Sequence, residues 1–383
     1  MTTRITVLGG GYGGVAFIKK LMAQRADVAV TLIDRNAYHT VLTEVHQVAA
    51  GNRAPESIRI PFAEMDGFRF IQAEVTGLNP ATREVLTTVG PVEYDTLILA
   101  LGGVDTDFGV PGVRQNTLML HGMRDALAIR DRLNGLPADA PVVVAGGGLT
   151  GVELAAEIGL RRGATSNITL VEGAPTLLPA LAGVLQRGAR RRLGALGVNV
   201  LTGAKIARVD EQMVHFTDGS ALPFALMVWA CGVRANPLIA QFGIATDRGG
   251  RAPVDEYLRT ELPDVYALGD SAATGLPPTA QAANQQGANL AEHIAALLRG
   301  QIRPLRPVQM RGTLVDLGHI FGVGSLGDTL HTAGLLPALL KRANVAKWLW
   351  TAAGLVTATR YFFGLPVGAA AGGKPVDEGQ GGM

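Results

Sequence analysis

A strand, a glycine-rich turn, a helix and a second strand that ends in an acidic residue occur twice in this chain. In the first copy, Gly9–Gly14 follows a short apolar strand, and the second strand ends at Asp34. In the second copy, about 137 residues later, Gly146–Gly151 follows another apolar strand, and the unit ends at Glu172. Strands that alternate with helices in this way predict an α/β fold with parallel sheets.

The glycine spacing predicts what each copy binds. The first glycine permits a tight turn between strand and helix, the second lets the backbone approach a pyrophosphate, and the third lets helix and strand pack closely. The pyrophosphate then lies at the positive N-terminus of the helix, and Asp34 or Glu172 accepts hydrogen bonds from ribose hydroxyls. One such turn is a weak signal, but two strand-flanked copies predict two bound dinucleotides. The glycines in these roles are Gly9, Gly11, Gly14, Gly146, Gly148 and Gly151.

Glu172 also indicates which nicotinamide cofactor the second copy prefers. A carboxylate at this position repels the 2′-phosphate of NADPH. Residues 173–178 contain no arginine or lysine that could offset the repulsion. We therefore expect NADH to be preferred over NADPH.

Length and composition limit the classes of protein to consider. A chain of 383 residues allows two domains and a small third. With 48% hydrophobic and 17% charged residues it is oily for a cytosolic enzyme, yet no stretch reaches about 18 consecutive apolar residues and the N-terminus has no signal-peptide layout. The formal net charge of +2 gives no reason to expect a nucleic-acid partner.

The single cysteine, Cys231, excludes an intramolecular disulfide and any redox relay of paired cysteines. Redox chemistry must therefore use a bound cofactor, and we interpret Cys231 as a small buried hydrophobic residue. The seven histidines show no spacing typical of metal ligands, so we expect no metal.

Motifs outside the two glycine loops extend the pattern. They are Tyr38–His39, His46–Gly51, Tyr94–Asp95 with Leu97–Gly103, Tyr266–Asp270 and Ala280–Gly287. From about Arg4 to His293 the chain thereby resembles the two-dinucleotide-binding-domain flavoproteins and, more closely, the type II NADH:quinone oxidoreductases, which do not pump protons. The resemblance implies FAD on the first copy, NADH on the second, and transfer of two electrons through FAD to a membrane quinone such as menaquinone or ubiquinone.

The resemblance also implies roles for individual residues. Glu153 would support nicotinamide positioning or the proton balance beside the flavin, and Gln281 and Gln285 would form the quinone side. Two alternatives stay open, because Glu153 could face solvent and the two glutamines, at i and i+4, could be a polar stripe on an amphipathic helix. The expected cofactor contacts are Gly9, Gly11, Tyr12, Gly13, Gly14, Asp34, Arg35, His46, Val75, Ala100, Gly102, Gly146, Gly148, Gly151, Glu172, Gly232, Gly269, Asp270, Ala280 and Gln281.

The order of the motifs predicts that the second Rossmann-like domain is inserted into the first. We expect an FAD-binding domain from residues 1–112 and 243–307, and an NADH-binding domain from 113–242. A mostly helical membrane-association region would follow at 308–368, and a glycine-rich, disordered tail at 369–383.

The C-terminal region predicts a contact with a membrane surface. Between Arg299 and Arg360 there are eight basic and two acidic residues, and Trp348 and Trp350 lie among the lysines and arginines. This combination is typical of a helix, here interrupted at Pro337, that lies in the headgroup plane. We therefore expect peripheral attachment to the cytoplasmic face of the cell membrane. The alternative is a helix that packs on its own domain or on the partner in a homodimer.

Two other functions remain open at this point. A soluble ferredoxin-type NADH reductase would leave no acceptor motif in the sequence, and a flavin-binding redox sensor or interaction protein would not turn over. Sulfide:quinone and disulfide reductases use paired cysteines, so the single Cys231 excludes both.

Overall fold

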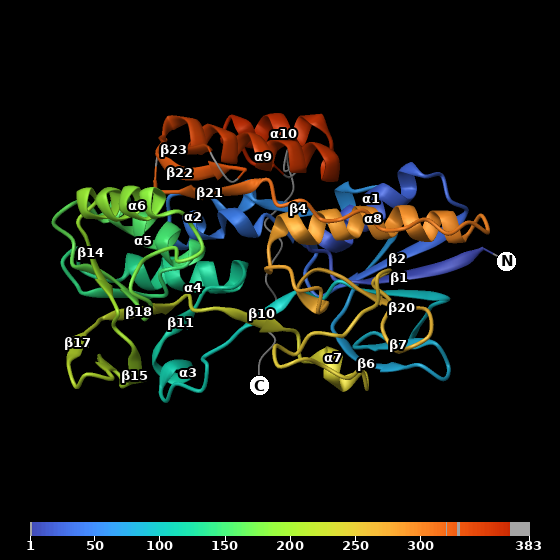
Figure 1. The fold of residues 1–383 in the computed structure, drawn as a ribbon, viewed down its shortest axis with the longest axis horizontal. Coiled ribbons are helices and arrows are strands. Elements are labelled where there is room, and N and C mark those ends of the chain that lie inside the picture. The colour runs from blue at the N-terminus through green and yellow to red at the C-terminus, as the bar shows by residue number, and fades with distance from the viewer. Residues whose placement is uncertain (1, 319, 328–329, 368–383) are drawn as a thin grey trace.

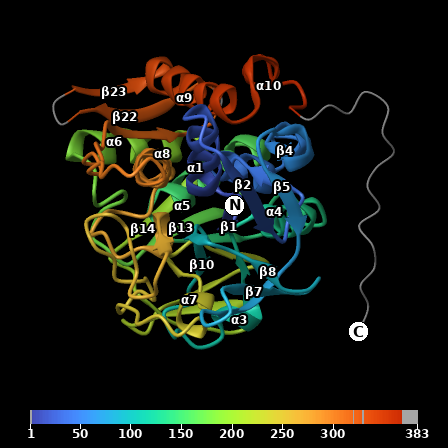
Figure 2. The same cartoon turned by 90° about the vertical axis from the view of Figure 1, so that its right-hand side faces the viewer.

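The computed structural model describes residues 2–318, 320–327 and 330–367. Two sheet-centred domains lie side by side, and a C-terminal layer covers the top of both (Figure 1). The view turned by 90° shows the same layer on top (Figure 2). The expected tail at 369–383 lies outside the described residues.

The first domain is built on a parallel five-stranded sheet with the strand order β20-β9-β1-β2-β5. Strands β1, β9 and β20 are mostly apolar and buried, as expected where helices cover a parallel sheet, whereas the edge strand β5 is partly exposed. The sheet comprises β1 (Thr3–Leu8), β2 (Val28–Asp34), β5 (Arg69–Gln72), β9 (Thr96–Leu99) and β20 (Val265–Ala267). The helices are α1 (Tyr12–Ala23), α2 (Val45–Ala50) and α8 (Ala280–Leu297), with short turns η1 (Leu42–Glu44), η2 (Pro55–Ser57), η3 (Phe62–Glu64) and η4 (Gly269–Ser271). Smaller antiparallel sheets are β3 (Tyr38–Thr40) with β4 (Arg59–Pro61), and β6 (Val75–Asn79), β7 (Glu84–Thr87) and β8 (Val92–Glu93).

The second domain repeats this architecture with the parallel order β11-β18-β12-β13-β14. The sheet comprises β11 (Leu118–Met119), β12 (Val142–Ala145), β13 (Ile168–Glu172), β14 (Val198–Thr202) and β18 (Leu226–Trp229). The helices are α3 (Val113–Asn116), α4 (Met123–Asn134), α5 (Leu149–Arg162) and α6 (Gly183–Ala195). A three-stranded antiparallel sheet of β15 (Ile206–Val209), β16 (Met213–Phe216) and β17 (Ala221–Pro223) matches β6–β8 of the first domain. The duplication in the sequence is therefore a duplication of the fold.

Two antiparallel strands, β10 (Gly103–Asp105) and β19 (Val233–Ala235), carry the chain between the domains. On the outward crossing, Val113 already packs in the core of the second domain, and a boundary at residue 112 stays a prediction. On the way back, Ala235 and the following helix α7 (Leu238–Gln241) already pack in the core of the first domain. The return crossing thus lies near Val233, about ten residues before the expected boundary at 243.

The C-terminal region contains a sheet that the sequence analysis did not predict. Strands β21 (Gly312–Asp316), β22 (Gly322–Leu326) and β23 (Leu330–Gly334) form an antiparallel meander before α9 (Leu335–Ala353) and α10 (Leu355–Phe362). The helix break is at Gly354, which has a φ of +93°, and not at Pro337, because proline is tolerated in the first turn of a helix. Within the described residues, no helix has the length and apolarity needed to cross a membrane.

The two tryptophans of α9 face in opposite directions, which corrects the expected membrane surface. Trp348 is buried, whereas Trp350 is 61% exposed, because residues two apart on a helix are separated by about 200°. Lys341 and Tyr361 also point inward. Of the basic residues in this region, Arg303 and Arg306 form ion pairs with the same carboxylate, Glu292. Only part of the predicted basic and aromatic set therefore faces outward.

Helices α1 and α8 touch backbone to backbone, which gives a test of the first domain's packing. A Cβ atom added at Gly287 of α8 would overlap the carbonyl oxygen of Gly13 and lie 3.0 Å from the amide nitrogen of Phe17. We expect Gly287→Ala to lower the free energy of unfolding by about 1–3 kcal/mol, because the added methyl group forces the helices apart. Thermal denaturation monitored by circular dichroism measures the change.

The matched control is Gly194→Ala in α6, where an added Cβ has no other atom within 4 Å. Replacing an unhindered helical glycine by alanine stabilises by up to about 1 kcal/mol. The two substitutions should therefore shift the melting temperature in opposite directions. Equal shifts would contradict the close approach of α1 and α8.

Candidate functional site

The first glycine loop has the geometry of a dinucleotide cradle. Gly9 has a φ of +101°, and a Cβ there would overlap the carbonyl oxygen of Ala100 at the end of β9. A Cβ at Gly14 would overlap the carbonyl oxygen of Gly9 itself. In contrast, Gly11, the N-cap of α1, has open space where its Cβ would lie. The loop is thus closed on the protein side and open at the helix N-terminus, where a diphosphate would bind.

The second loop repeats the same contacts one by one. Gly146 has a φ of +110°, and its Cβ would lie 2.7 Å from the carbonyl oxygen of Ala230 at the end of β18. A Cβ at Gly151 would overlap the Gly146 carbonyl, and Gly148 again faces open space. The repeat therefore includes a third strand in each domain, β9 in the first and β18 in the second. The sequence alone does not identify these two strands as part of the repeat.

The two acidic residues occupy equivalent places beside the loops. Asp34 Oδ2 accepts a hydrogen bond from Gly10 N (2.7 Å), and Glu172 Oε2 accepts one from Gly147 N (2.6 Å). Burial raises the pKa of Asp34, although hydrogen bonds from Gly10 and Asn36 oppose the shift. Both carboxylates lie at strand ends next to the open side of the loop, as expected for ribose contacts, and that role stays a prediction.

Other expected cofactor contacts cluster at the same strand ends. Gly102 and Gly232 follow β9 and β18 with φ values of +67° and +71°. Between Ala230 and Gly232, burial raises the pKa of the Cys231 thiol to about 12, so it stays protonated at neutral pH. Asp270, in η4, has its pKa raised by burial, and Gly269 N donates to Gln286 Oε1 at 2.6 Å.

Four expected contacts lie less directly on the open side of the loops. A Cβ at Gly13 would overlap the side chain of Leu268, so this glycine serves helix packing. Arg35 is exposed, Val75 is half-buried at the start of β6, and Ala280 is the first residue of α8. For these four residues the structure shows only how they pack or where they lie. Their contact with a cofactor stays a prediction.

The Tyr12 side chain points towards the C-terminal region instead of along the loop. Its ring centroid lies 5.2 Å from that of His39 and 5.0 Å from that of Trp348. Trp348 Nε1 donates to His39 Nε2 at 3.0 Å, so the other ring nitrogen, Nδ1, carries the proton and donates to the carbonyl oxygen of Gly10 at 2.8 Å. Burial lowers the pKa of His39 to about 4, so the ring is neutral at neutral pH. Helix α9 is thereby linked to the first glycine loop.

The two glutamines of the expected quinone side bind one backbone segment. Gln285 Nε2 donates to Gln309 O at 2.9 Å, and Gln309 N donates to Gln285 Oε1 at 3.0 Å. Gln281 Nε2 donates to the same carbonyl oxygen at 3.3 Å. These bonds attach the segment before β21 to α8. This arrangement agrees with the alternative in which the two glutamines are a polar stripe on an amphipathic helix. A contact between either glutamine and a quinone stays a prediction.

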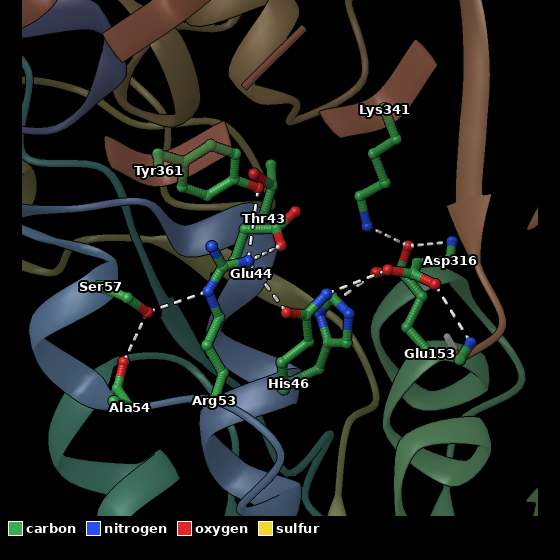
Figure 3. A network of polar contacts seen from close by, with 12 residues as sticks. Thr43, Glu44, His46, Arg53, Ala54, Ser57, Glu153, Asp316, Lys341 and Tyr361 are labelled. Carbon is green, nitrogen blue, oxygen red and sulfur yellow. Dashed lines mark hydrogen bonds and ion pairs between the residues drawn. The ribbon is translucent and has the colours of Figure 1, made fainter. Parts of the chain in front are cut away.

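Side chains from all three parts of the chain meet in a buried polar network (Figure 3). Glu153 of α5 accepts hydrogen bonds at Oε1 from Lys341 Nζ of α9 (2.6 Å) and from Asp316 N of β21 (2.9 Å). His46 of α2 places Nδ1 3.5 Å from Glu153 Oε2. On the other side of His46, Arg53 pairs with Glu44 at 2.9 Å. The network borders a cavity of about 590 Å³ that is lined by Glu44, Arg53, Glu157, Asp316, Lys341 and Tyr361, among others.

Burial controls the charges in this network. It raises the pKa of Glu153 to about 7, against the attraction of Lys341, and it raises the pKa of Glu157 to about 7. The pKa of His46 is well below its usual value, because burial is reinforced by Lys341 and Arg53. At neutral pH the imidazole is therefore uncharged, and the two glutamates exchange protons with water in the physiological range.

Glu153 does not face solvent, which excludes that alternative, and its carboxylate points to the C-terminal region. Most of its neighbours cannot be recognised in the sequence because they come from distant segments, and the local pattern places Lys341 with the basic residues of the expected membrane surface. One local signal was available. Glu153 and Glu157 lie one helical turn apart in the otherwise apolar stretch 152–160, which places both on one buried face.

Comparisons with known proteins agree with this architecture. Residues 3–287 match the family model of the pyridine nucleotide-disulphide oxidoreductases. A type II NADH:quinone oxidoreductase of Staphylococcus aureus (strain MW2) is 30% identical over 375 residues, which cover 88% of this chain and 93% of the relative. The NADH dehydrogenase-like protein YutJ of Bacillus subtilis (strain 168) is 29% identical over 351 residues, covering 88% and 96%.

Solved structures show the same fold over more than nine tenths of the chain. The NDH2 of Plasmodium falciparum in complex with NADH has a TM-score of 0.83 at 20% identity, covering 95% of this chain and 97% of that one. The sulfide:quinone oxidoreductase of Aquifex aeolicus has a TM-score of 0.81 at 20% identity, covering 92% of each chain. At these identities the likeness establishes the fold, including the C-terminal layer.

The open sides of the two loops give a paired test of the cofactor assignment. Gly11→Ala places a methyl group where FAD would approach, so we expect purified protein with less FAD and an unchanged melting temperature of the FAD-free form. Gly148→Ala should keep its FAD but raise the KM for NADH at least tenfold, about 1.4 kcal/mol. Each variant is the control for the other. The reverse outcome would mean that the two loops are assigned to the wrong cofactors.

Proposed function

The chain belongs to the pyridine nucleotide-disulphide oxidoreductase family and, within it, to the type II NADH:quinone oxidoreductases, and from this premise we propose that it passes two electrons from NADH through FAD to a membrane quinone without pumping protons. The observation that carries the proposal is the pair of equivalent glycine loops together with a polar pocket that residues of the C-terminal region help to line. FAD and NADH are the cofactors.

The protein's own residues bind and orient the two dinucleotides. When bound, FAD accepts a hydride from NADH and delivers two electrons to the acceptor. In this proposal the helix N-termini of α1 and α5 would bind the two diphosphates, and Asp34 and Glu172 would accept hydrogen bonds from the riboses. Glu172 supports a preference for NADH, because its carboxylate is held at the loop by Gly147 N and Ala174 N.

The buried network supplies what a quinone acceptor needs from the protein. Quinone reduction takes up two protons with the two electrons, so a proton donor must lie beside the acceptor. Glu153 can donate a proton near neutral pH, and Lys341 compensates the charge that remains. This assignment differs from a role in nicotinamide positioning, because the carboxylate points towards the C-terminal region.

The outer face of α9 and α10 supports attachment to a membrane surface. Its exposed side chains include Trp350, Leu355, Val356, Phe362 and Phe363, and an apolar groove of about 690 Å³ lies among them beside Lys347. Exposed aromatic and aliphatic residues beside a lysine suit the headgroup region of a bilayer. We propose peripheral attachment at the cytoplasmic face, where quinone is reached from the bilayer and NADH from water. A homodimer through this face is the alternative.

Anaerobic stopped-flow spectroscopy tests the proposed function. NADH should bleach the flavin absorbance in one step, and mixing with menaquinone or ubiquinone analogues in vesicles should restore it. A ferredoxin that restores the absorbance where quinones fail would favour the ferredoxin-type reductase. Flavin that is reduced once and is restored by no acceptor would favour the redox sensor. Protein that binds no FAD would refute every one of these functions.

The pKa of Glu153 predicts a pH dependence for the acceptor step alone. Its pKa lies near 7, well above the usual value for a carboxyl group, so the proton is present below pH 7 and is lost as the pH rises through it. Reoxidation of the flavin by quinone should therefore slow above pH 7. In Glu153→Gln this pH step should vanish and the rate at pH 6 should fall by about 100-fold.

The control is Glu211→Gln, the same substitution at an exposed residue of the second domain, which should leave both half-reactions unchanged. Reduction of the flavin by NADH should keep its rate in Glu153→Gln. If reduction by NADH slows instead, Glu153 acts on the nicotinamide side.

The same substitution at two valines of similar exposure tests the proposed membrane surface. Val356 in α10 is 72% exposed and Val89, in the turn between β7 and β8, is 65% exposed. Val356→Asp should weaken binding to anionic vesicles at least tenfold, about 1.4 kcal/mol, because it adds a negative charge to the apolar face. Val89→Asp should bind like the wild type in the same vesicle sedimentation assay. If Val356→Asp leaves vesicle binding intact but changes the oligomeric state, the face is a dimer interface.

A further inference from the structure

Two carboxylates of the buried network lack a cationic partner. Glu44 pairs with Arg53, and Glu153 pairs with Lys341 at 2.6 Å. Over the described part of the chain, no basic side chain forms an ion pair with Glu157 or Asp316. Glu157 is bound by the Asn52 amide, and Asp316 is bound by Gln47 Nε2 (3.0 Å) and Gly318 N (3.1 Å).

The imidazole of His46 lies against the same two carboxylates. His46 is 2% exposed, and its Nε2 has no hydrogen-bond partner among the described residues. A buried polar nitrogen without a partner is costly, so it indicates that a group is missing. One ligand atom each from His46, Glu157 and Asp316 lies within 4.8 Å of the others. Around an ion with bonds of about 2.0–2.2 Å, ligand atoms lie about 3–4.4 Å apart, so small side-chain movements close the site.

The histidine spacing gives no reason to expect a metal, but the fold brings three ligands together from distant segments. We propose that His46, Glu157 and Asp316 bind one divalent transition-metal ion of the class that zinc and manganese represent. One imidazole nitrogen and two carboxylates suit these ions, whereas magnesium and calcium prefer oxygen ligands alone. The two carboxylates line the cavity of about 590 Å³, which gives the ion a path from solvent and leaves room for water ligands. The site neutralises the two carboxylates that the protein's own cations leave unpaired.

The ion would join all three parts of the structure, because its ligands come from α2, α5 and the end of β21. The other charged groups that face the site are Lys341 and Arg53, whose positive charges lower the affinity, and the carboxylates Glu44 and Glu153, whose negative charges raise it. Both cations are held by carboxylates of their own, so binding in the micromolar range is expected. The site lies beside Glu153, the proposed proton donor. Zinc binding can nevertheless be tested separately from the proposed electron transfer, because it is measured without NADH or quinone.

Isothermal titration of the FAD-loaded protein with zinc chloride tests the site directly. One zinc ion should bind per chain, and magnesium chloride should bind at least 100-fold more weakly. Asp316→Asn and His46→Gln should each weaken zinc binding more than tenfold. The matched control is His215→Ala, because His215 forms an exposed pair with Asp210 at 2.7 Å that offers zinc a histidine and a carboxylate away from the site. This variant should bind zinc like the wild type.

A second measurement needs no substitution. X-ray absorption spectra of the zinc-loaded wild type should show one imidazole and oxygen ligands, without sulfur. The proposal is overturned if the wild type binds no zinc at one ion per chain, if sulfur from Cys231 is a ligand, or if His215→Ala abolishes binding while Asp316→Asn and His46→Gln do not. FAD content recorded for each variant separates loss of zinc binding from loss of the fold.

Discussion

The buried ion pair between Glu153 and Lys341 joins the second domain to the C-terminal region, and His46 of the first domain lies beside it. Removing one partner of such a pair costs about 3–5 kcal/mol, because an uncompensated charge stays buried. The C-terminal region is therefore part of the site and not an appendage attached to it. The same pair determines the chemistry, since Lys341 partly offsets the effect of burial on Glu153 and leaves a carboxyl group that titrates near neutral pH.

Helix α9 contacts three regions of the structure for which different functions are proposed. Its outer face carries exposed Trp350, while its inner face carries Lys341 into the polar network and Trp348 to His39. His39 in turn donates to the carbonyl of Gly10 in the first glycine loop. Helix α9 thus contacts the proposed membrane surface, the proposed acceptor pocket and, through His39, the first glycine loop.

The dinucleotide cradles could be predicted because their signals are local. Gly9 and Gly146 need positive φ values and a close backbone approach that only glycine allows, and these demands act within a few residues of sequence. The sequence does not reveal that β9 and β18 are equivalent. At their ends, Ala100 and Ala230 contribute only a backbone carbonyl oxygen, which every residue has. The two glutamines of α8 were identified, but not their bonds to the backbone of Gln309, because hydrogen bonds to a main-chain atom leave no mark in the sequence.

The sequence by itself determined the duplicated α/β fold and the insertion of one domain into the other, and its motifs indicated FAD and NADH as cofactors, because periodicity and glycine spacing are local properties. The tertiary structure alone decided which side chains of the C-terminal region face inward. Composition indicated a basic, aromatic surface, but helical geometry placed Lys341 and Trp348 in the interior and Trp350 outside. It also decided that His46, Glu157 and Asp316 meet, because three residues separated by more than a hundred positions each become neighbours only when two domains and a third layer pack together.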